Sequence, residues 1–171
     1  MKFETNASKE AVLQKVQEML NGLKLQVNKH DFDRPWGGFF VIDEEQTADF
    51  IRFFFPEQDK DELVAGGRLS PKILVVAPGK RLSWQYHRRR AEIWRVIGGH
   101  AGVVTSDTDN ETELKHLAPG ETIVLKQGER HRLVGLEEYG VVAEIWQHTQ
   151  PQHPSDEDDI VRLQDDFGRQ S

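Results

Sequence analysis

The spacing of apolar residues changes partway along this chain, from a helical period to short runs separated by turns. Over residues 8–21, Val12, Val16 and Leu20 recur four positions apart, and Ser8 stands where a helix N-cap is expected. This spacing places the apolar side chains on one face of a helix. The pattern therefore predicts an amphipathic helix over residues 8–21, which would pack on a sheet or on a second subunit.

A second, shorter helix is predicted over residues 47–55. Ala48, Ile51 and Phe54 fit one helical face, and Pro56 follows at a position where it stops a helix. The run is also short enough to form a strand, but the helical face is the better fit.

The pattern of apolar residues changes from Lys72 onward, where short apolar runs follow one another at intervals of roughly ten residues. Gly and Pro residues separate the runs, which cover residues 73–77, 82–87, 93–97, 101–105, 113–117, 122–126, 131–134 and 140–147. No helical pattern lies between them, so a parallel α/β sheet is excluded. The pattern predicts an all-β fold, an antiparallel sandwich or barrel, with an N-terminal helix and a few short helices.

Composition adds limits to this picture. The 171 residues, 37% hydrophobic and 30% charged, fit one soluble domain. No apolar run reaches the roughly 18 residues that span a membrane, and the polar N-terminal segment lacks a signal core. The absence of cysteine excludes disulfides and thiolate chemistry. We therefore expect a cytoplasmic protein, and the net charge of −7 argues against binding to nucleic acid.

Four residues carry metal-ligand chemistry. Gln85 and His87 are two positions apart, so on a strand they point to the same face. Glu92 follows across or just past a tight bend, and His131 comes three residues after Gly128. Two imidazoles, a carboxylate and an amide oxygen suit one divalent ion, with zinc expected first and manganese, cobalt, iron or nickel as alternatives. Polar residues hydrogen-bonded to one another inside a barrel are the structural alternative.

A local cationic cluster stands out in this acidic chain. It consists of Lys80-Arg81 and Arg88–Arg90. Such a cluster indicates a small anionic ligand, and a solvated strand face is the alternative.

These residues resemble the two motifs of the cupin superfamily. The first reads Gly79-(x)5-Gln85-x-His87-(x)4-Glu92-(x)6-Gly99, with Gln85 in place of the first histidine of the motif. The second reads Gly120-(x)5-Lys126-x-Gly128-(x)2-His131-(x)3-Gly135, and it departs from the motif at two turn positions that are not ligands. The resemblance implies a double-stranded β-helix, or jelly roll, which agrees with the strand pattern.

A closer resemblance is to the type II phosphomannose isomerase domain, which usually ends bifunctional mannose-1-phosphate guanylyltransferase/mannose-6-phosphate isomerase chains. The shared motifs keep the order of that family: Arg34-Pro-Trp-Gly37, Lys72, Leu82-Ser-Trp-Gln-Tyr-His87, Arg90-Ala-Glu-Ile-Trp94, His131-Arg-Leu133, Glu144-Ile145, and Glu157-Asp-Asp-Ile-Val-Arg162 through Asp166-Phe-Gly-Arg169. The guanylyltransferase part has no counterpart in the sequence, so a stand-alone isomerase is expected. Residues 1–33 would form an N-terminal helical extension, and residues 34–171 the cupin isomerase domain.

The resemblance implies aldose–ketose isomerisation of a sugar phosphate, with mannose 6-phosphate and fructose 6-phosphate as the expected pair. The implied site residues are, for the metal, Gln85, His87, Glu92 and His131; for catalysis, Arg90, Lys72 and Glu144; and for substrate binding, Arg132 and Arg88. Glu144 is the candidate general base, with orientation of a ligand histidine as its alternative role. Ile93 stands where the family favours histidine, so we expect it to remove a polar group near the metal and to alter substrate preference.

Other functions remain open for a cupin. An iron dioxygenase prefers a histidine-rich site, which Gln85 weakens, and epimerases of this fold generally use a His–Tyr pair without a metal. A third alternative is a non-catalytic sugar-binding cupin. The expected partner is a small sugar phosphate, with no nucleic acid and no membrane, and a homodimer is the expectation for a jelly roll of this size.

Overall fold

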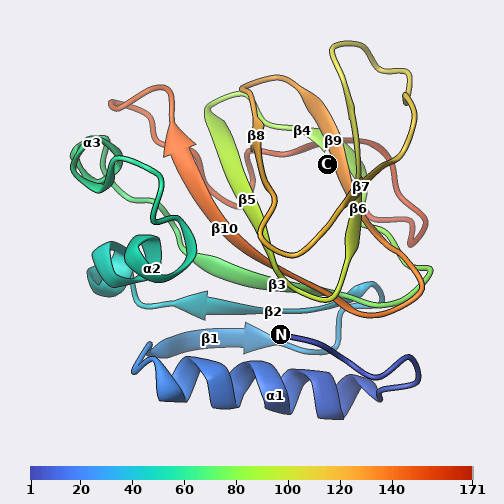
Figure 1. Cartoon of the computed structure of the whole chain (residues 1–171). Coiled ribbons are helices and arrows are strands. Elements are labelled where there is room, and N and C mark those ends of the chain that lie inside the picture. Colours follow the sequence, from blue (N-terminus) through green and yellow to red (C-terminus); the bar gives the residue numbers. More distant parts are fainter. Residues whose placement is uncertain (171) are drawn as a thin grey trace.

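Two antiparallel β-sheets form the frame of the chain, which a computed structural model describes over residues 1–170 (Figure 1). The larger sheet has the order β1 (Val27–Asp31), β2 (Gly37–Ile42), β3 (Lys72–Val76), β10 (Gly140–His148), β5 (Arg90–Gly98) and β8 (Thr122–Leu125). The smaller sheet has the order β11 (Val161–Gln164), β4 (Trp84–Tyr86), β9 (Arg130–Gly135), β6 (Ala101–Ser106) and β7 (Lys115–Leu117). Each of the eight predicted strands is present, and the predicted jelly roll is confirmed.

Helices are present at both positions that the apolar spacing predicts. The helices are α1 (Lys9–Gly22), α2 (Thr47–Phe54) and α3 (Lys60–Ala65), with the short 3₁₀ helix η1 (Glu44–Gln46) before α2. Ser8 caps α1 as predicted, since its hydroxyl accepts a hydrogen bond from the backbone N–H of Ala11 at 3.1 Å. Helix α3 was not predicted, although Asp59 caps it by accepting from the N–H of Glu62.

Both faces of the larger sheet are buried, which explains the continuous apolar runs of its central strands. On the outer face, Ile73 and Val75 of β3 pack with the buried sides of α1 and α2 in one hydrophobic cluster. On the inner face, Leu74 and Val76 pack against Leu133 of the smaller sheet in a second cluster. The sheet therefore separates a helix-covered layer from the interior of the jelly roll.

The N-terminal segment contributes to the same frame. Within residues 1–33, α1 adds Val16 and Leu20 to the outer hydrophobic cluster, and β1 extends the larger sheet by pairing with β2. The boundary expected after residue 33 stays a prediction. Among residues 1–170, no helix is long and apolar enough to cross a membrane.

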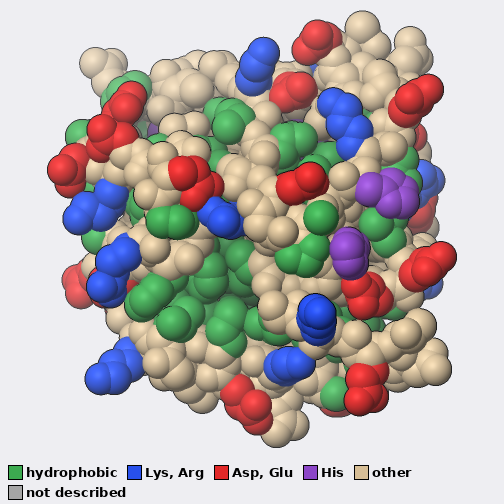
Figure 2. All heavy atoms as spheres, viewed as in Figure 1, with side chains coloured by type: hydrophobic (Ala, Val, Ile, Leu, Met, Phe, Trp, Pro, Cys, Tyr) green, Lys and Arg blue, Asp and Glu red, His purple; other side chains and the backbone are tan. Residues whose placement is uncertain are grey.

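An apolar groove lies between α1 and α2. Figure 2 shows hydrophobic side chains gathered on this face of the molecule. The groove has a volume of about 690 Å³, and its apolar lining consists of Met1, Met19, Phe53, Phe54, Val96 and Ile97. The predicted homodimer stays a prediction.

Because α1 packs so closely on the sheet, we expect Leu20→Ala to lower the free energy of unfolding by about 2–5 kcal/mol. Leu20 is fully buried, and its removal leaves a cavity in the outer cluster. The exposed Gln14 of the same helix gives the control Gln14→Ala, which should cost at most about 0.5 kcal/mol. Chemical denaturation of both variants measures the difference, and equal losses would show that α1 is not part of the core.

Candidate metal centre and substrate cavity

Three of the four predicted ligands meet between the two sheets. His87 follows β4, Glu92 lies on β5 and His131 on β9, and each side chain is almost fully buried. His87 Nε2 lies 3.1 Å from Glu92 Oε1, and His131 Nε2 lies 3.5 Å from Glu92 Oε2. One ligand atom from each residue falls within 4.8 Å of the other two, which is the spread that a single ion can bridge.

The donors of this group fit a divalent metal ion. Glu92 Oε2 and His131 Nε2 are buried and make no hydrogen bond, although burying such atoms without a partner is costly. Burial also lowers the pKa of His87, so its imidazole is neutral at pH 7, which is the form that binds a metal. Two imidazole nitrogens and a carboxylate suit Zn²⁺, Mn²⁺, Co²⁺, Fe²⁺ or Ni²⁺.

Backbone carbonyls fix the orientation of both imidazoles. His87 Nδ1 lies 2.7 Å from the carbonyl oxygen of Asp159, and His131 Nδ1 lies 3.0 Å from that of Glu129. A carbonyl oxygen only accepts, so each Nδ1 carries the proton and each Nε2 keeps its lone pair for the centre. The metal-binding tautomer is thus set before any ion arrives.

Gln85 also reaches this group, as the strand spacing predicted. Its backbone pairs with His131 across β4 and β9, and its side-chain Nε2 lies 3.4 Å from His87 Nε2. Its Oε1 accepts a hydrogen bond from Ser83 instead of facing the centre. Ligation through Oε1 requires the amide to turn over, so Gln85 as a fourth ligand stays a prediction.

Arg90 ties the ligands to the C-terminal segment. Its Nε donates to Glu92 Oε1 at 2.9 Å, and its Nη1 donates to Ser155 Oγ at 3.0 Å. Burial by itself raises the pKa of Glu92, but the interactions of this carboxylate with His87 and Arg90 outweigh burial and hold that pKa well below its usual range. These interactions therefore favour the negatively charged form of Glu92.

Glu144 is a second buried carboxyl group on the inner face of the larger sheet. Its Oε2 accepts from Trp94 Nε1 at 2.8 Å, and its Oε1 accepts from Trp146 Nε1 at 3.1 Å. Burial, followed by the charge of Glu92, raises the pKa of Glu144 to about 7. A carboxyl group with this pKa exchanges a proton near neutral pH, which is the property a general base needs.

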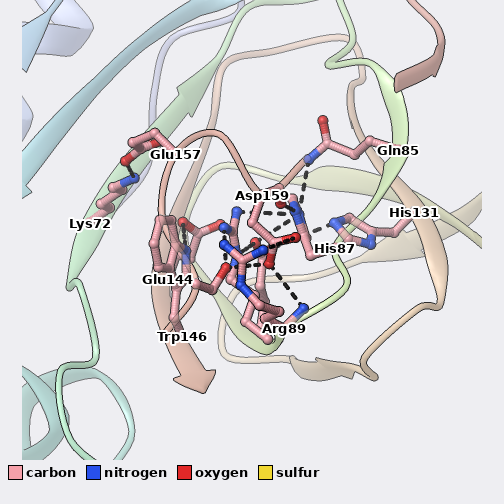
Figure 3. Close-up of polar contacts among 12 residues, drawn as sticks. Lys72, Gln85, His87, Arg89, His131, Glu144, Trp146, Glu157 and Asp159 are labelled. Carbon is pink, nitrogen blue, oxygen red and sulfur yellow. Dashed lines mark hydrogen bonds and ion pairs between the residues drawn. The ribbon is translucent and has the colours of Figure 1, made fainter. Parts of the chain in front are cut away.

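Lys72 lies opposite Glu144 in the register of β3 and β10. Its ammonium forms an ion pair with Glu157 and sits 4.4 Å from the ring centroid of Trp146. In Figure 3, Lys72 and Glu157 lie at one end of the drawn group and Gln85 and His131 at the other. Lys72 is thus on the same inner face as the carboxylates, away from the metal ligands.

Two cavities open beside these residues. The inner cavity, of about 140 Å³, has a polar lining that includes Gln85, Arg90, Glu92, Glu144, Lys72 and Glu157. The outer cavity, of about 450 Å³, shares five lining residues with it, namely Arg34, Phe39, Lys72, Glu157 and Arg162. A small polar molecule can therefore reach Glu92 and Glu144 together.

The two predicted substrate-binding arginines do not line either cavity. Arg132 neighbours His131 on β9, so it points to the opposite face, where it donates to Glu111 at 3.0 Å and is fully buried. Arg88 is exposed, and its backbone N–H donates to Asp159 Oδ1. Their predicted role in binding phosphate has no support in their positions.

The expectation for Ile93 is also corrected. Ile93 lies between Glu92 and Trp94 on β5, so its side chain points away from the metal centre. It is buried in the outer hydrophobic cluster with the residues of α1 and α2. The substitution at this position therefore removes no polar group from the centre.

Sequence reasoning missed the part that the C-terminal segment plays. Both side-chain oxygens of Asp159 accept backbone N–H groups, from Arg88 and Arg89, at 3.0 Å each. Ser155 Oγ also donates to Asp159 at 2.6 Å, which locks the segment over His87. Nothing in the acidic pattern of residues 156–159 indicated that the backbone carbonyl of Asp159 would hold the imidazole of His87.

A jelly roll that buries two histidines and a glutamate between its sheets, beside a polar cavity, defines a cupin-type protein with a candidate metal site. The family model described as "Mannose-6-phosphate isomerase C-terminal" matches residues 45–165, and the chain belongs to this family. The family resemblance inferred from the motifs is thus confirmed.

Individual relatives agree with this assignment. The mannose-1-phosphate guanylyltransferase of Escherichia coli (strain K12) is 37% identical over 136 residues, and ManC of Salmonella typhimurium, another mannose-1-phosphate guanylyltransferase, is 35% identical over 136 residues. Each match covers 80% of this chain but 22% of the relative, so the chain spans under a quarter of their length. The capsular polysaccharide assembling protein CapF of Staphylococcus aureus, at 16% identity, shares the fold with a TM-score of 0.52 over 82% of this chain and 34% of its own.

Since the carboxylate of Asp159 holds the segment whose carbonyl orients His87, we expect Asp159→Ala to weaken metal binding by about 10- to 100-fold. The neighbouring Asp158 is exposed, and Asp158→Ala is the matched control, with unchanged affinity expected. Competition between the protein and a chromogenic chelator for Zn²⁺ or Co²⁺ measures both variants. Equal affinities would show that the segment does not position the histidine.

We also expect Glu144 to make the metal-free protein less stable as pH rises. The folded-state pKa of about 7 lies above the ordinary 4.5, so between these values the folded state holds a proton that the unfolded chain releases. Stability attributable to Glu144 is present below about pH 4.5 and falls by on the order of 3 kcal/mol as pH passes through 7.

Glu144→Gln removes this decline, because the amide does not titrate. Free energies of unfolding, measured by denaturant titration from pH 5 to 8, should therefore converge for the two proteins in acid and separate at higher pH in favour of the variant. Parallel curves would mean that Glu144 titrates at an ordinary pKa.

Proposed function

We propose that this chain is a metal-dependent aldose–ketose isomerase for a sugar phosphate, with mannose 6-phosphate and fructose 6-phosphate as the first pair to test. The observation that carries the proposal is one inner cavity lined by both Glu92 of the metal group and Glu144, whose pKa is about 7. Membership of the mannose-6-phosphate isomerase C-terminal family supports the choice of reaction.

The reaction moves a proton between C1 and C2 of the sugar through an enediolate. The deprotonated carboxylate of Glu144 takes this proton, and the protonated carboxyl group returns it to the neighbouring carbon. In the metal-free protein the pKa of this carboxyl group is about 7. The indole N–H groups of Trp94 and Trp146 hold the carboxylate in one orientation throughout.

His87, Glu92 and His131, with Gln85 as the proposed fourth ligand, would hold a divalent ion, which would supply Lewis-acid stabilisation of negative charge on the substrate oxygens. Zinc is the first candidate, with manganese, cobalt, iron and nickel as the others.

Arg90 and Lys72 add positive charge around the same cavity. The guanidinium of Arg90 lies 3.6 Å from the ring centroid of Trp146, which fixes it as part of the cavity wall. Its hydrogen bond to Glu92 keeps that ligand in place, and the ammonium of Lys72 faces the cavity beside Glu144. Both groups attract the anionic substrate and stabilise the enediolate.

The direct test is an isomerase assay on a panel of aldose and ketose phosphates, run with each of the five metals. We expect interconversion of mannose 6-phosphate and fructose 6-phosphate, with a rate that is lost when a chelator removes the metal. Binding without turnover across the panel would favour a non-catalytic sugar-binding protein. Inversion at one carbon without ketose formation would identify an epimerase, and oxygen consumption a dioxygenase.

Two variants separate the base from the metal centre. Glu144→Gln should lower kcat by about 10²- to 10⁴-fold and leave the metal content unchanged, because it removes the proton acceptor only. His131→Ala should lose the metal and the activity together. Glu137→Gln, an exposed position on the turn after β9, is the control with unchanged kinetics. Full activity in Glu144→Gln would remove Glu144 from the mechanism.

A further inference from the structure

Three arginines line the inner cavity without a part in the proton transfer. Arg34 lies just before β2, Arg162 on β11, and Arg169 seven residues beyond it. They come from the two ends of the sequence and meet at the same cavity as Glu92 and Glu144. We call Arg34, Arg162 and Arg169 the arginine wall.

The members of the arginine wall lie close enough for their charges to interact. Burial, and then the charge of Arg169, lower the pKa of Arg162; Asp165 acts in the opposite direction, and Arg34 lowers this pKa further. A cluster of positive charges beside a cavity attracts an anion into it. The partners of two of these arginines, Asp31 for Arg34 and Asp165 for Arg169, do not line the cavity.

Each of these aspartates pairs with its arginine, through hydrogen bonds in the case of Arg169 and through an ion pair without a hydrogen bond in the case of Arg34. Arg34 meets Asp31 through Nε at 3.0 Å, which leaves its two terminal nitrogens outside that contact. Arg169 meets Asp165 through Nε at 2.9 Å and Nη2 at 2.8 Å, which leaves Nη1 outside it. The nitrogens outside these contacts can donate several hydrogen bonds to one tetrahedral anion.

A further donor lines the same cavity. The indole Nε1 of Trp36 is buried and has no hydrogen-bond partner among the residues that the structure describes. Because an unsatisfied buried N–H is unfavourable, this atom indicates that an acceptor from outside the chain completes the site.

The two cavities have the sizes that a sugar phosphate needs if it binds across both. The inner cavity, of about 140 Å³, is smaller than an ordinary ligand pocket of roughly 300 Å³ or more. The outer cavity adds about 450 Å³, and Arg34 and Arg162 line both. A ligand with its reacting carbons at Glu144 therefore extends past the arginine wall.

We propose that Arg34, Arg162 and Arg169 bind the phosphate group of the sugar substrate, with Trp36 as an additional donor. This inference rests on the proposed isomerase function and names the part of the site that selects a phosphorylated sugar. It replaces Arg132 and Arg88, which lie outside the cavities, in that role.

The binding test uses two probes that cannot turn over: inorganic phosphate and a hexitol 6-phosphate, which has no carbonyl group. Calorimetric titration of the metal-loaded protein should show binding that weakens by about 10- to 100-fold in Arg34→Gln and in Arg162→Gln, the loss expected for charge-assisted hydrogen bonds. Arg162→Lys keeps the charge and should retain more affinity than Arg162→Gln. Arg52→Gln, on the exposed side of α2, is the matched control with unchanged affinity.

Repeating the phosphate titration after a chelator has removed the metal separates two sources of binding. Phosphate held by the arginine wall still binds and remains sensitive to Arg34→Gln. Phosphate held only by the metal is lost with the metal, and that result would overturn the proposal. Melting temperatures identify any variant that has not folded, and Arg34, which lies in a turn and is partly exposed, provides the substitution least able to disturb the fold.

Kinetics distinguish failure of this inference from failure of the proposed function. If the protein is an isomerase, Arg34→Gln should raise KM for the sugar phosphate by about tenfold or more and change kcat little. Turnover with an unchanged KM would overturn the arginine wall and leave the isomerase standing. Arginine-dependent binding of both probes without turnover on any sugar phosphate would support the wall and overturn the isomerase.

Discussion

The pairing of β5 with β10 places two carboxylates inside the jelly roll, and the rest of the site depends on how their burial is compensated. Glu92 and Glu144 lie on the same inner face of the larger sheet, and each is almost fully buried. Glu92 keeps its charge because Arg90 and two histidines surround it, whereas Glu144 has two indole donors and a pKa near 7. Opposite surroundings thus give two like groups opposite pKa shifts, lowered for Glu92 and raised for Glu144.

The C-terminal segment after β10 adds contacts that hold the side chains of the candidate site in place. Its Asp159 carbonyl orients His87, its Ser155 hydroxyl contacts Arg90, and its Glu157 pairs with Lys72. Farther on, Arg162 and Arg169 complete the cavity wall with an arginine from the other end of the chain. The candidate metal site and the cavity are therefore completed by residues that follow β10, the last long strand, so the site depends on the C-terminal segment as well as on the two sheets.

Prediction from the sequence succeeded where the signal was local. The helical spacing of α1, its Ser8 cap and the eight apolar runs all correspond to observed elements. It failed where two neighbouring residues on one strand had to be assigned to opposite faces. Arg132 beside His131, and Ile93 beside Glu92, both point away from the centre because side chains alternate along a strand.

The sequence alone determined the family, the two longer helices and the eight strands from Lys72 onward, and it singled out His87, Glu92 and His131, because motif spacing and periodicity are properties of short segments. Only the tertiary structure decided which polar residues share a cavity, since that depends on strand register and on contacts between distant segments. The register of β3 and β10 places Glu144 opposite Lys72, and the tertiary fold brings Arg34 and Arg162 to the same cavity. The raised pKa of Glu144 likewise exists only in the folded chain, because burial is its main cause.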